Sequence, residues 1–167
     1  GTEFNQNEIE KELNNAGAKF EILKYEQLID KTAELLSKEK AIGWFQGRME
    51  FGPRALGGRS ILGDPRSDQM QKNLNLKVKY RESFRPFAPS ILREDLSKWF
   101  DMNIDSPYML LVGNIIPNKK IEMTDEQIKL FGIDKLNIKR SEIPAVTHVD
   151  YTARIQTVKR DTNSRYY

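Results

Sequence analysis

The stretch GRMEFGPRALGGRSILGDPR, residues 47 to 66, decides how the rest of this chain is interpreted. It holds five of the ten glycines together with four arginines, and few residues that could anchor a hydrophobic core. Glycine lets the backbone approach a ligand closely, and the planar fork of arginine matches phosphate or carboxylate oxygens. We therefore predict an anion-binding loop here, with a plain structural turn as the alternative.

The loop is not predicted to be the phosphate loop of a P-loop ATPase. Gly52 and Gly57 have the required spacing, but Gly58 stands where the motif needs lysine. Pro53 also lacks the backbone N–H that such a loop would use.

Positive charge is concentrated around this loop. Between Gly47 and Arg93 the chain carries ten basic residues and four acids, whereas the whole chain has a net charge of only +3. A local cationic centre in a nearly balanced protein favours a small polyanionic ligand over a long nucleic acid, which usually needs a broad basic face.

The composition narrows the remaining classes. With 167 residues the chain is predicted to form one domain, residues 1–167, and the absence of cysteine excludes disulfides and thiolate metal sites. We expect a cytoplasmic protein, because no apolar run spans a bilayer and no signal peptide is evident. His148 is the single histidine, so we expect no transition-metal site made by the protein itself.

Periodicity predicts alternating helices and strands. Helices are expected at 8–15, 25–40 and from about residue 67 to 79, where Ser67 could cap the helix, with one or two further turns at 95–100. Strands are expected at 18–23, 41–46, 109–116, 145–149 and 153–158. Residues 80–92 should be extended because of Pro86 and Pro89, and residues 117–142 should be a peripheral excursion with a cap at Thr124. The fold class is therefore α/β (α+β), with a twisted mixed β-sheet flanked by helices.

Several polar residues outside the loop are candidates for a site. A run of cations comprises Lys77, Lys79, Arg81 and Arg85, and a solvated basic face is the ordinary interpretation of such a run. The aromatic residues and prolines around it suggest instead that some of these charges are partly buried and need an anion. Arg154 alternates with apolar residues in a predicted strand, where an ordinary outward-facing residue is as good an interpretation. For His148 a hydrogen-bonded core histidine is favoured over a catalytic one.

Three blocks of the sequence, taken together, resemble one known family. They are GRMEFGPRALGGRSILGDPR (47 to 66), KYRESFRPFAPSIL (79 to 92) and IPAVTHVDYTARIQTV (143 to 158). In order and spacing they are similar to the C-terminal, YrdC-like domain of the NodU/TobZ-type O-carbamoyltransferases. The resemblance covers most of the chain after residue 41.

The resemblance implies an activity and a set of site residues. In that family this domain makes carbamoyl-adenylate from carbamoyl phosphate and ATP, with Mg²⁺ carried by the nucleotide, and a Kae1-like domain transfers the carbamoyl group to an acceptor hydroxyl. The matching positions that would bind substrate and nucleotide are Arg54, Arg59, Lys79, Arg85, Thr152 and Arg154. Of these, Lys79 and Arg85 are expected to be the central catalytic pair.

Further positions are secondary candidates: Glu50, Arg81, Ser90 and His148. Glu50 could orient an arginine or help to hold Mg²⁺, although an ordinary salt bridge with Arg48 or Arg54 is the favoured interpretation. Tyr151 departs from the family pattern, because a small residue, often glycine, is common there.

The resemblance also implies which parts of the enzyme the chain lacks, and it leaves one alternative function open. The chain has no Kae1-like domain, and family members continue beyond the third block, so we expect a fragment of a longer enzyme that depends on a Kae1-like domain of the same protein. The alternative from another class is an RNA- or nucleotide-binding module without catalysis of its own, because YrdC-like folds also present a basic concave surface.

Overall fold

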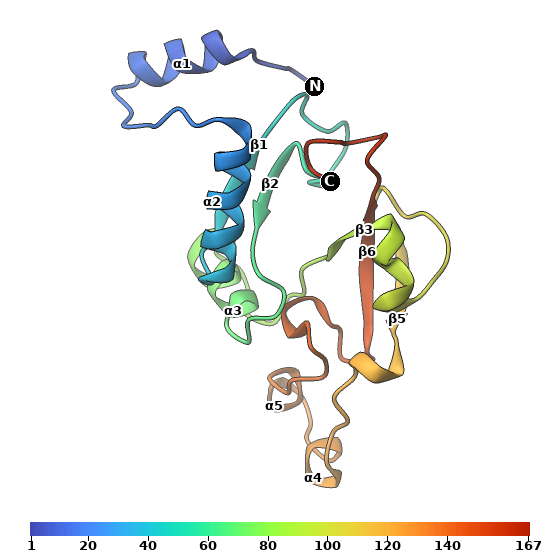
Figure 1. The fold of residues 1–167 in the computed structure, drawn as a ribbon. Coiled ribbons are helices and arrows are strands. Elements are labelled where there is room, and N and C mark those ends of the chain that lie inside the picture. The colour runs from blue at the N-terminus through green and yellow to red at the C-terminus, as the bar shows by residue number, and fades with distance from the viewer. The chain divides into compact units, whose positions relative to one another are not determined.

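The computed structural model describes all residues, Gly1–Tyr167, and divides the chain into two compact units, Gly1–Gly63 and Asp64–Tyr167 (Figure 1). The single domain expected from the length of the chain stays a prediction.

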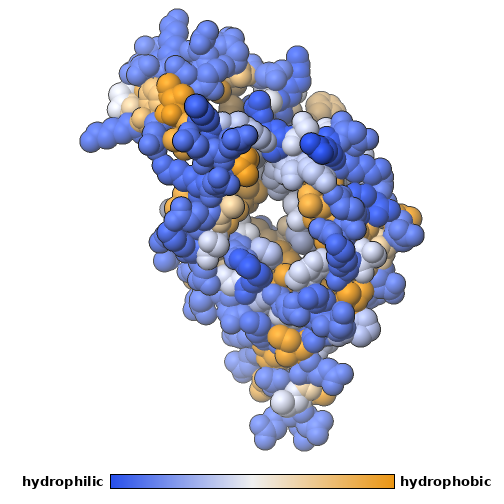
Figure 2. Space-filling model, viewed as in Figure 1, coloured by the Kyte–Doolittle hydropathy of each residue, from blue (hydrophilic) through white to orange (hydrophobic).

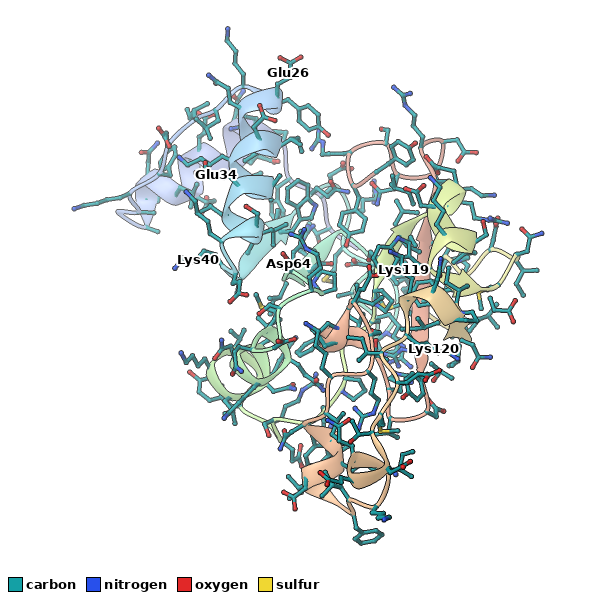
Figure 3. All side chains as sticks on the ribbon, turned by 60° about the horizontal axis from the view of Figure 1, so that its bottom comes forward. Glu26, Glu34, Lys40, Asp64, Lys119 and Lys120 are labelled. Atoms are coloured by element: carbon teal, nitrogen blue, oxygen red, sulfur yellow. The ribbon has the colours of Figure 1, made fainter.

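The first unit contains two helices and a two-stranded hairpin. They are α1 (Gln6–Asn15), α2 (Tyr25–Ser37), β1 (Ile42–Phe45) and β2 (Arg59–Leu62). Asn5 and Glu8 begin α1 with a reciprocal capping box, in which the Asn5 side chain accepts from the backbone N–H of Glu8 at 3.0 Å. The charged side of α2 carries Glu26 and Glu34 (Figure 3), and α2 contacts β1.

The hairpin places the glycine-rich loop. β1 and β2 are antiparallel, with Ile42 opposite Leu62 and Phe45 opposite Arg59. The backbone N–H of Gln46 also donates to the carbonyl of Gly58 at 2.9 Å, which extends the pairing by one step. Residues 47–57 therefore close the hairpin as a long loop held at both ends.

The second unit is built on a mixed four-stranded sheet in the order β3-β6-β5-β4. The strands are β3 (Ser90–Leu92), β4 (Phe100–Asp101), β5 (Leu111–Ile115) and β6 (Thr152–Val158). β6 is parallel to β3 and antiparallel to β5, and β5 is antiparallel to β4. The mixed sheet with helices confirms the predicted α/β fold class.

Short helical segments connect and cover these strands. They are α3 (Met70–Leu74), η1 (Asn75–Lys79), η2 (Arg93–Lys98), η3 (Pro117–Lys119), α4 (Asp125–Ile128), α5 (Ile133–Leu136) and η4 (Pro144–Val146). Thr124 caps α4 as expected, since its hydroxyl accepts from the backbone N–H of Gln127.

Two clusters of buried side chains form the core of the second unit. The larger contains Leu96, Phe100, Ile115, Ile143, Val146, Ala153 and Ile155, and the smaller contains Met70, Leu74 and Ala145. Phe87 packs against both clusters and so joins them. Gly113 packs closely in this core, because a Cβ at its position would lie 2.8 Å from Cδ1 of Ile155 and the isoleucine side chain would have to shift.

Two predicted strands are wrong. Residues 18–23 alternate correctly but have no partner strand, and Ile22 is 63% exposed. Residues 145–149 form no strand either, because the Thr147 hydroxyl donates to the carbonyl of Ile143 at 2.8 Å and stabilises the 3-10 turn η4 instead.

The predicted helix after Ser67 is correct only in part. The helix α3 begins at Met70 rather than at Ser67, whose hydroxyl accepts from the backbone N–H of Gln69 in a turn. At Asn75 the helix changes to the wider π form, η1, which ends at Lys79.

The surface is mostly polar on the face seen in Figure 2, with smaller hydrophobic areas between charged residues. None of the helices combines the length and the apolar character that a membrane span requires.

The core makes a direct prediction about stability. Leu96 is fully buried, so Leu96→Ala should lower the free energy of unfolding by about 2–5 kcal/mol, through lost transfer energy and the cavity left behind. Leu110 is 72% exposed, and Leu110→Ala should change the free energy of unfolding by less than about 0.5 kcal/mol. Urea denaturation of both variants checks this, and equal losses would contradict the assignment of the core.

Candidate functional site

A single buried amide, that of Asn75, organises the basic segment 79–85. Its side chain is fully buried, and Nδ2 donates to the carbonyl oxygens of Ser83 at 3.0 Å and Arg85 at 2.8 Å. Its Oδ1 accepts from Nε of Arg81 at 2.6 Å. One side chain therefore fixes three positions of the segment at once.

The local backbone explains why Asn75 lies opposite this segment. The π-helical turn η1 ends at Tyr80, which adopts a left-handed conformation with φ 49°. The backbone N–H of Arg81 then donates to the carbonyl of Asn75 at 3.0 Å, so the chain turns back over its own helix. Isolated π-turns of this kind are frequent at functional sites.

The three predicted cations of this segment differ in how firmly they are held. The guanidinium of Arg81 lies 5.0 Å from the centre of the Phe87 ring, in addition to its bond with Asn75. Arg85 pairs with Glu82 at 2.8 Å, but both side chains are about half exposed, so the pair is weak. Lys79 is exposed and forms no ion pair. Lys79 and Arg85 can therefore turn to an incoming anion.

A second polar group is built at the start of β6. Oδ1 of Asp150 accepts from both the backbone N–H of Thr152 at 3.1 Å and its hydroxyl at 2.7 Å. Because the hydroxyl uses its one hydrogen in the bond to Asp150, it accepts from Nδ1 of His148 at 2.9 Å. This network assigns the ring proton to Nδ1 and leaves Nε2 of His148 as an acceptor.

The electrostatics of His148 agree with a neutral ring. Burial lowers the pKa of His148 below its ordinary value, Asp150 offsets part of this, and the positive charge of Arg154 adds to the lowering. His148, Thr152 and Arg154 are thus brought together. The expectation of a hydrogen-bonded histidine agrees with this geometry, while a catalytic role stays a prediction.

Alternation along β6 separates this polar group from the core. Ala153 and Ile155 are fully buried in the larger core cluster, so Thr152, Arg154 and Gln156 belong to the opposite face of the strand. On that face the hydroxyl of Ser90 donates to Oε1 of Gln156 at 2.8 Å across the parallel pair of strands. The hydroxyl of Tyr166 donates to Ser90 at 3.0 Å.

Tyr151, which stands where the family commonly has a small residue such as glycine, lies in the turn before β6. This residue has φ 65°, a conformation that glycine adopts without strain and tyrosine adopts at a cost. Its hydroxyl donates to the carbonyl of Ile121 at 3.3 Å, and Lys120 (Figure 3) lies 5.3 Å from the centre of its ring. These contacts hold the strained residue in place.

In the first unit, the predicted arginines have different surroundings. Arg54 is exposed and forms no ion pair. Arg59 donates through its two Nη atoms to the carbonyl oxygens of Thr2, Gln46, Gly47 and Gly58, at 2.8 to 3.3 Å, and its guanidinium lies 3.4 Å from the centre of the Phe45 ring. Arg59 thus ties the two ends of the glycine-rich loop together.

Glu50 is the internal anion of the glycine-rich loop. Its Oε1 accepts from the backbone N–H groups of Leu56 at 2.7 Å, Gly58 at 2.7 Å and Arg59 at 3.3 Å. The favoured expectation of a salt bridge with Arg48 or Arg54 is wrong, since Arg48 pairs with Glu3 and the carboxylate of Glu50 is held by backbone.

The glycines of the loop fit this arrangement. A Cβ at Gly58 would lie 2.8 Å from the carbonyl oxygen of Arg48 and 3.0 Å from Oε2 of Glu50, while Gly52 and Gly57 have φ values of 128° and 106°. The backbone of the loop holds an anion that is part of the chain, the carboxylate of Glu50, while the predicted binding of a ligand anion by its arginines stays a prediction.

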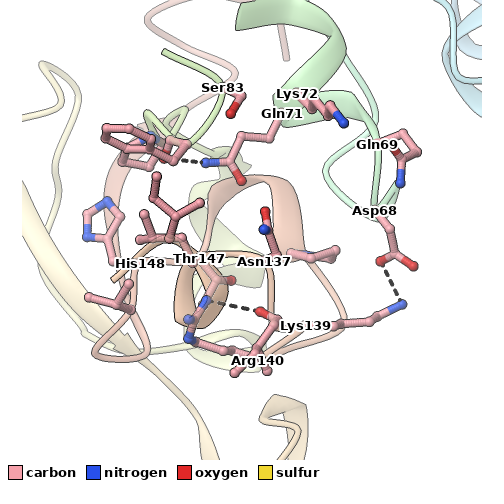
Figure 4. A pocket seen from close by; sticks show the side chains of 17 residues that line it. Asp68, Gln69, Gln71, Lys72, Ser83, Asn137, Lys139, Arg140, Thr147 and His148 are labelled. Carbon is pink, nitrogen blue, oxygen red and sulfur yellow. Dashed lines mark hydrogen bonds and ion pairs between the residues drawn. The ribbon is translucent and has the colours of Figure 1, made fainter. Parts of the chain in front are cut away.

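Sequence reasoning missed two features of the second unit. Asn75 gave no motif, although a polar residue following Leu74 in an otherwise apolar helix face was a weak signal. Residues 133–140 were expected to be peripheral, yet they line a pocket of about 630 Å³ together with His148 (Figure 4). No three histidine, aspartate or glutamate side chains gather as a set of metal ligands.

Comparison with known proteins connects this geometry to a family. A family model described as the carbamoyltransferase C-terminus matches residues 33–167. The protein sll1178 of Synechocystis sp. is 54% identical over 100% of this chain and 28% of its own length. The nodulation protein NolO of Bradyrhizobium diazoefficiens is 39% identical over 98% of this chain and 27% of its own length.

A relative with a named activity also matches. The 3'-hydroxymethylcephem-O-carbamoyltransferase of Amycolatopsis lactamdurans is 34% identical over 83% of this chain and 22% of its own length. The chain thus spans only between 22% and 28% of the length of these three relatives.

The Glu50 nest predicts a defined dependence of stability on pH. Burial raises the pKa of Glu50, but bonds from the backbone N–H groups of Leu56, Gly58, Arg59 and Glu50 itself outweigh it, so the pKa is lowered. The stabilisation is therefore complete above the unfolded pKa of about 4.3 and is lost as pH falls through the lower folded value. Glu50→Gln should destabilise the first unit by about 1–3 kcal/mol near neutral pH and flatten this acid limb. Denaturation between about pH 7 and pH 3 measures both effects.

The control for this experiment is Glu12→Gln, an exposed carboxylate of α1 in the same unit. It should leave the neutral stability and the acid limb unchanged. If the Glu50→Gln curve overlays that of the control, the nest does not contribute to stability.

Asn75 yields a second prediction for the site. Asn75→Ala removes three hydrogen bonds of a buried group, and it should cost about 1–3 kcal/mol of unfolding free energy and loosen residues 81–85. Hydrogen exchange at these amides should speed up. Asn73→Ala, on the exposed side of α3, is the matched control and should leave exchange unchanged. Unchanged protection in Asn75→Ala would show that other contacts order the segment.

Proposed function

Since the chain belongs to the carbamoyltransferase C-terminal domain family, we propose that it is the part of an O-carbamoyltransferase that binds carbamoyl phosphate and ATP and forms carbamoyl-adenylate. The observation that carries this proposal is the segment 79–85, in which a buried asparagine fixes the backbone while Lys79 and Arg85 remain able to meet an anion. The acceptor hydroxyl would be served by a Kae1-like domain of the full-length protein.

The chemistry explains why such a segment suits the reaction. Water cleaves carbamoyl phosphate to carbamate and inorganic phosphate, and the carbamate oxygen then bonds the α-phosphorus of ATP while pyrophosphate leaves. Because this reaction brings polyanions together, the protein must offset their repulsion and the charge that develops at phosphorus. Lys79 and Arg85 would turn their positive charges to the phosphates, with Arg81 held by Asn75 in the same segment. The loss of one such group typically slows a reaction by about 10²- to 10³-fold.

The polar group at β6 supports the same site within the second unit. Thr152 offers a hydroxyl fixed by Asp150, and Arg154 lies near enough to His148 to affect its pKa. We assign Arg154 to the phosphates of the substrates, together with Thr152, whose hydroxyl exchanges its bond to Asp150 for one to a phosphate oxygen when substrate binds. Arg54 and Arg59 stay predictions for substrate binding, and within the first unit Arg59 holds the glycine-rich loop that carries Arg54.

Magnesium would enter with the nucleotide. The only carboxylate within segment 79–85 is Glu82, which pairs with Arg85, so the protein offers few ligands of its own there. When bound, Mg²⁺ would neutralise charge on the phosphates.

The test is carbamoyl-phosphate-dependent exchange of pyrophosphate into ATP, measured on the full-length enzyme. Lys79→Ala and Arg85→Ala should each reduce the exchange rate by about 10²- to 10³-fold, because each removes a charge that meets the phosphates. Titration calorimetry should show weaker binding of ATP and carbamoyl phosphate.

Lys77→Ala is the matched control, because Lys77 belongs to the same π-turn and is also exposed. It should leave exchange and binding nearly unchanged. Either of two results would favour the nucleic-acid-binding alternative over the proposed enzyme. The first is an equal effect of Lys79→Ala, Arg85→Ala and Lys77→Ala on exchange and binding. The second is RNA binding that weakens steeply as salt rises, with no pyrophosphate exchange.

A further inference from the structure

The pocket of the second unit lies beside the proposed site and has its own charge pattern. It encloses about 630 Å³, and segments 68–72, 83–86, 133–140 and 144–149 form its walls (Figure 4). Lys72, Lys139 and Arg140 line it with a single carboxylate, that of Asp68, which pairs with Lys139 at 3.0 Å. With His148 neutral, the lining carries a net charge of +2.

Arg140 is the unusual member of this lining. The residue is only 4% exposed, and no carboxylate lies within ion-pair distance of it. Nη1 donates to the carbonyl of Ile138 at 3.0 Å and Nη2 donates to the carbonyl of Lys135, while the buried Nε has no partner. Burial lowers the pKa of Arg140, which is the expected response of a desolvated cation.

A buried cation without a counter-ion is costly. Desolvation of a guanidinium costs several kcal/mol, and two neutral carbonyl oxygens compensate only part of that charge. An apolar residue of similar volume would fill the same space without this penalty. Arg140 lies on the pocket wall, so an anion that enters the pocket would supply the missing counter-ion. This would explain why an arginine is found at this buried position.

The other walls indicate what else the ligand contains. Phe84, Pro86, Ile133 and Leu136 present apolar surface to the same space. Pockets of this volume that combine apolar walls with a few polar groups are typical of small organic ligands. The net charge of +2 matches a dianion better than a monoanion, and arginine matches phosphate oxygens with its planar fork.

We propose that this pocket binds a small organic phosphate, with its phosphoryl group at Arg140 and its organic part against Phe84, Pro86 and Leu136. Lys72 contributes long-range attraction from the opposite wall (Figure 4). The inference rests on the pocket alone, so it stands or falls independently of adenylate formation at Lys79 and Arg85.

The test measures binding to the 167-residue chain. Phenyl phosphate and inorganic phosphate are the probes, and acetate is tested as a carboxylate for comparison. The affinities measured by calorimetry should decrease in the order phenyl phosphate, inorganic phosphate, acetate. Phenyl phosphate should bind at least about tenfold more tightly than acetate. Phenyl phosphate should also raise the melting temperature by mass action.

Three variants separate a ligand site from a structural clasp. Arg140→Met should weaken phenyl phosphate binding by about tenfold or more, whereas Lys72→Gln should weaken it by about threefold. Lys129→Gln, at the end of α4 and outside the pocket, should change nothing. Without ligand, Arg140→Met should melt at the same temperature as the parent or higher, because it removes a buried charge.

The contrary results are equally definite. If phenyl phosphate does not bind the parent, or binds the Lys72→Gln and Arg140→Met variants as tightly as the parent, the proposal is wrong. If Arg140→Met melts earlier but Lys72→Gln binds as tightly as the parent, Arg140 only clasps residues 135–138. Acetate binding as tightly as phenyl phosphate would also overturn the assignment to phosphates.

Discussion

The second unit depends on one buried amide for the geometry of its most basic segment. Asn75 uses both its donors and its acceptor, so residues 81–85 are held in one arrangement although none of them is buried. A buried polar group fully satisfied in this way specifies a structure more sharply than apolar packing alone. The cost of leaving any of these groups unpaired keeps the segment in place without a ligand.

In segment 79–85, different residues order the backbone and carry the exposed positive charge. Backbone order comes from Asn75 and from the π-turn η1, so the cationic side chains are not needed to hold the fold. Arg81 is an exception, since it contributes to the network and stacks on Phe87, a residue that joins both core clusters. The site is therefore connected directly to the core through one aromatic ring.

The sequence predicted the fold class, both long helices and the strands at β1, β5 and β6, because helical spacing and runs of apolar residues indicate the type of element even where the side chains stay partly exposed. It failed for residues 18–23 and 145–149, since alternation does not reveal whether a partner strand exists or whether a threonine hydroxyl bonds the backbone first. The family resemblance was recovered from three blocks and is confirmed by the match over residues 33–167.

The residue types of the candidate site were predictable from the sequence, but their hydrogen-bond partners were not. Charge density pointed to segment 79–85, yet nothing in the sequence indicated that Asn75 would hold it or that Glu50 would fill the backbone nest. Arg140 was hidden for another reason, because a lone arginine in a polar stretch is normally solvated. Its burial depends on residues 133–140 folding back over the pocket.

The Glu50 nest has a consequence for how the glycine-rich loop responds to ligands. Because its anion is tethered six to nine residues away in the same chain, the local concentration of that anion is set by the loop and not by the cell. A free phosphate cannot readily displace it at ordinary concentrations. The loop therefore keeps one shape whether substrate is scarce or abundant, and Arg54 is presented from a surface that is already formed.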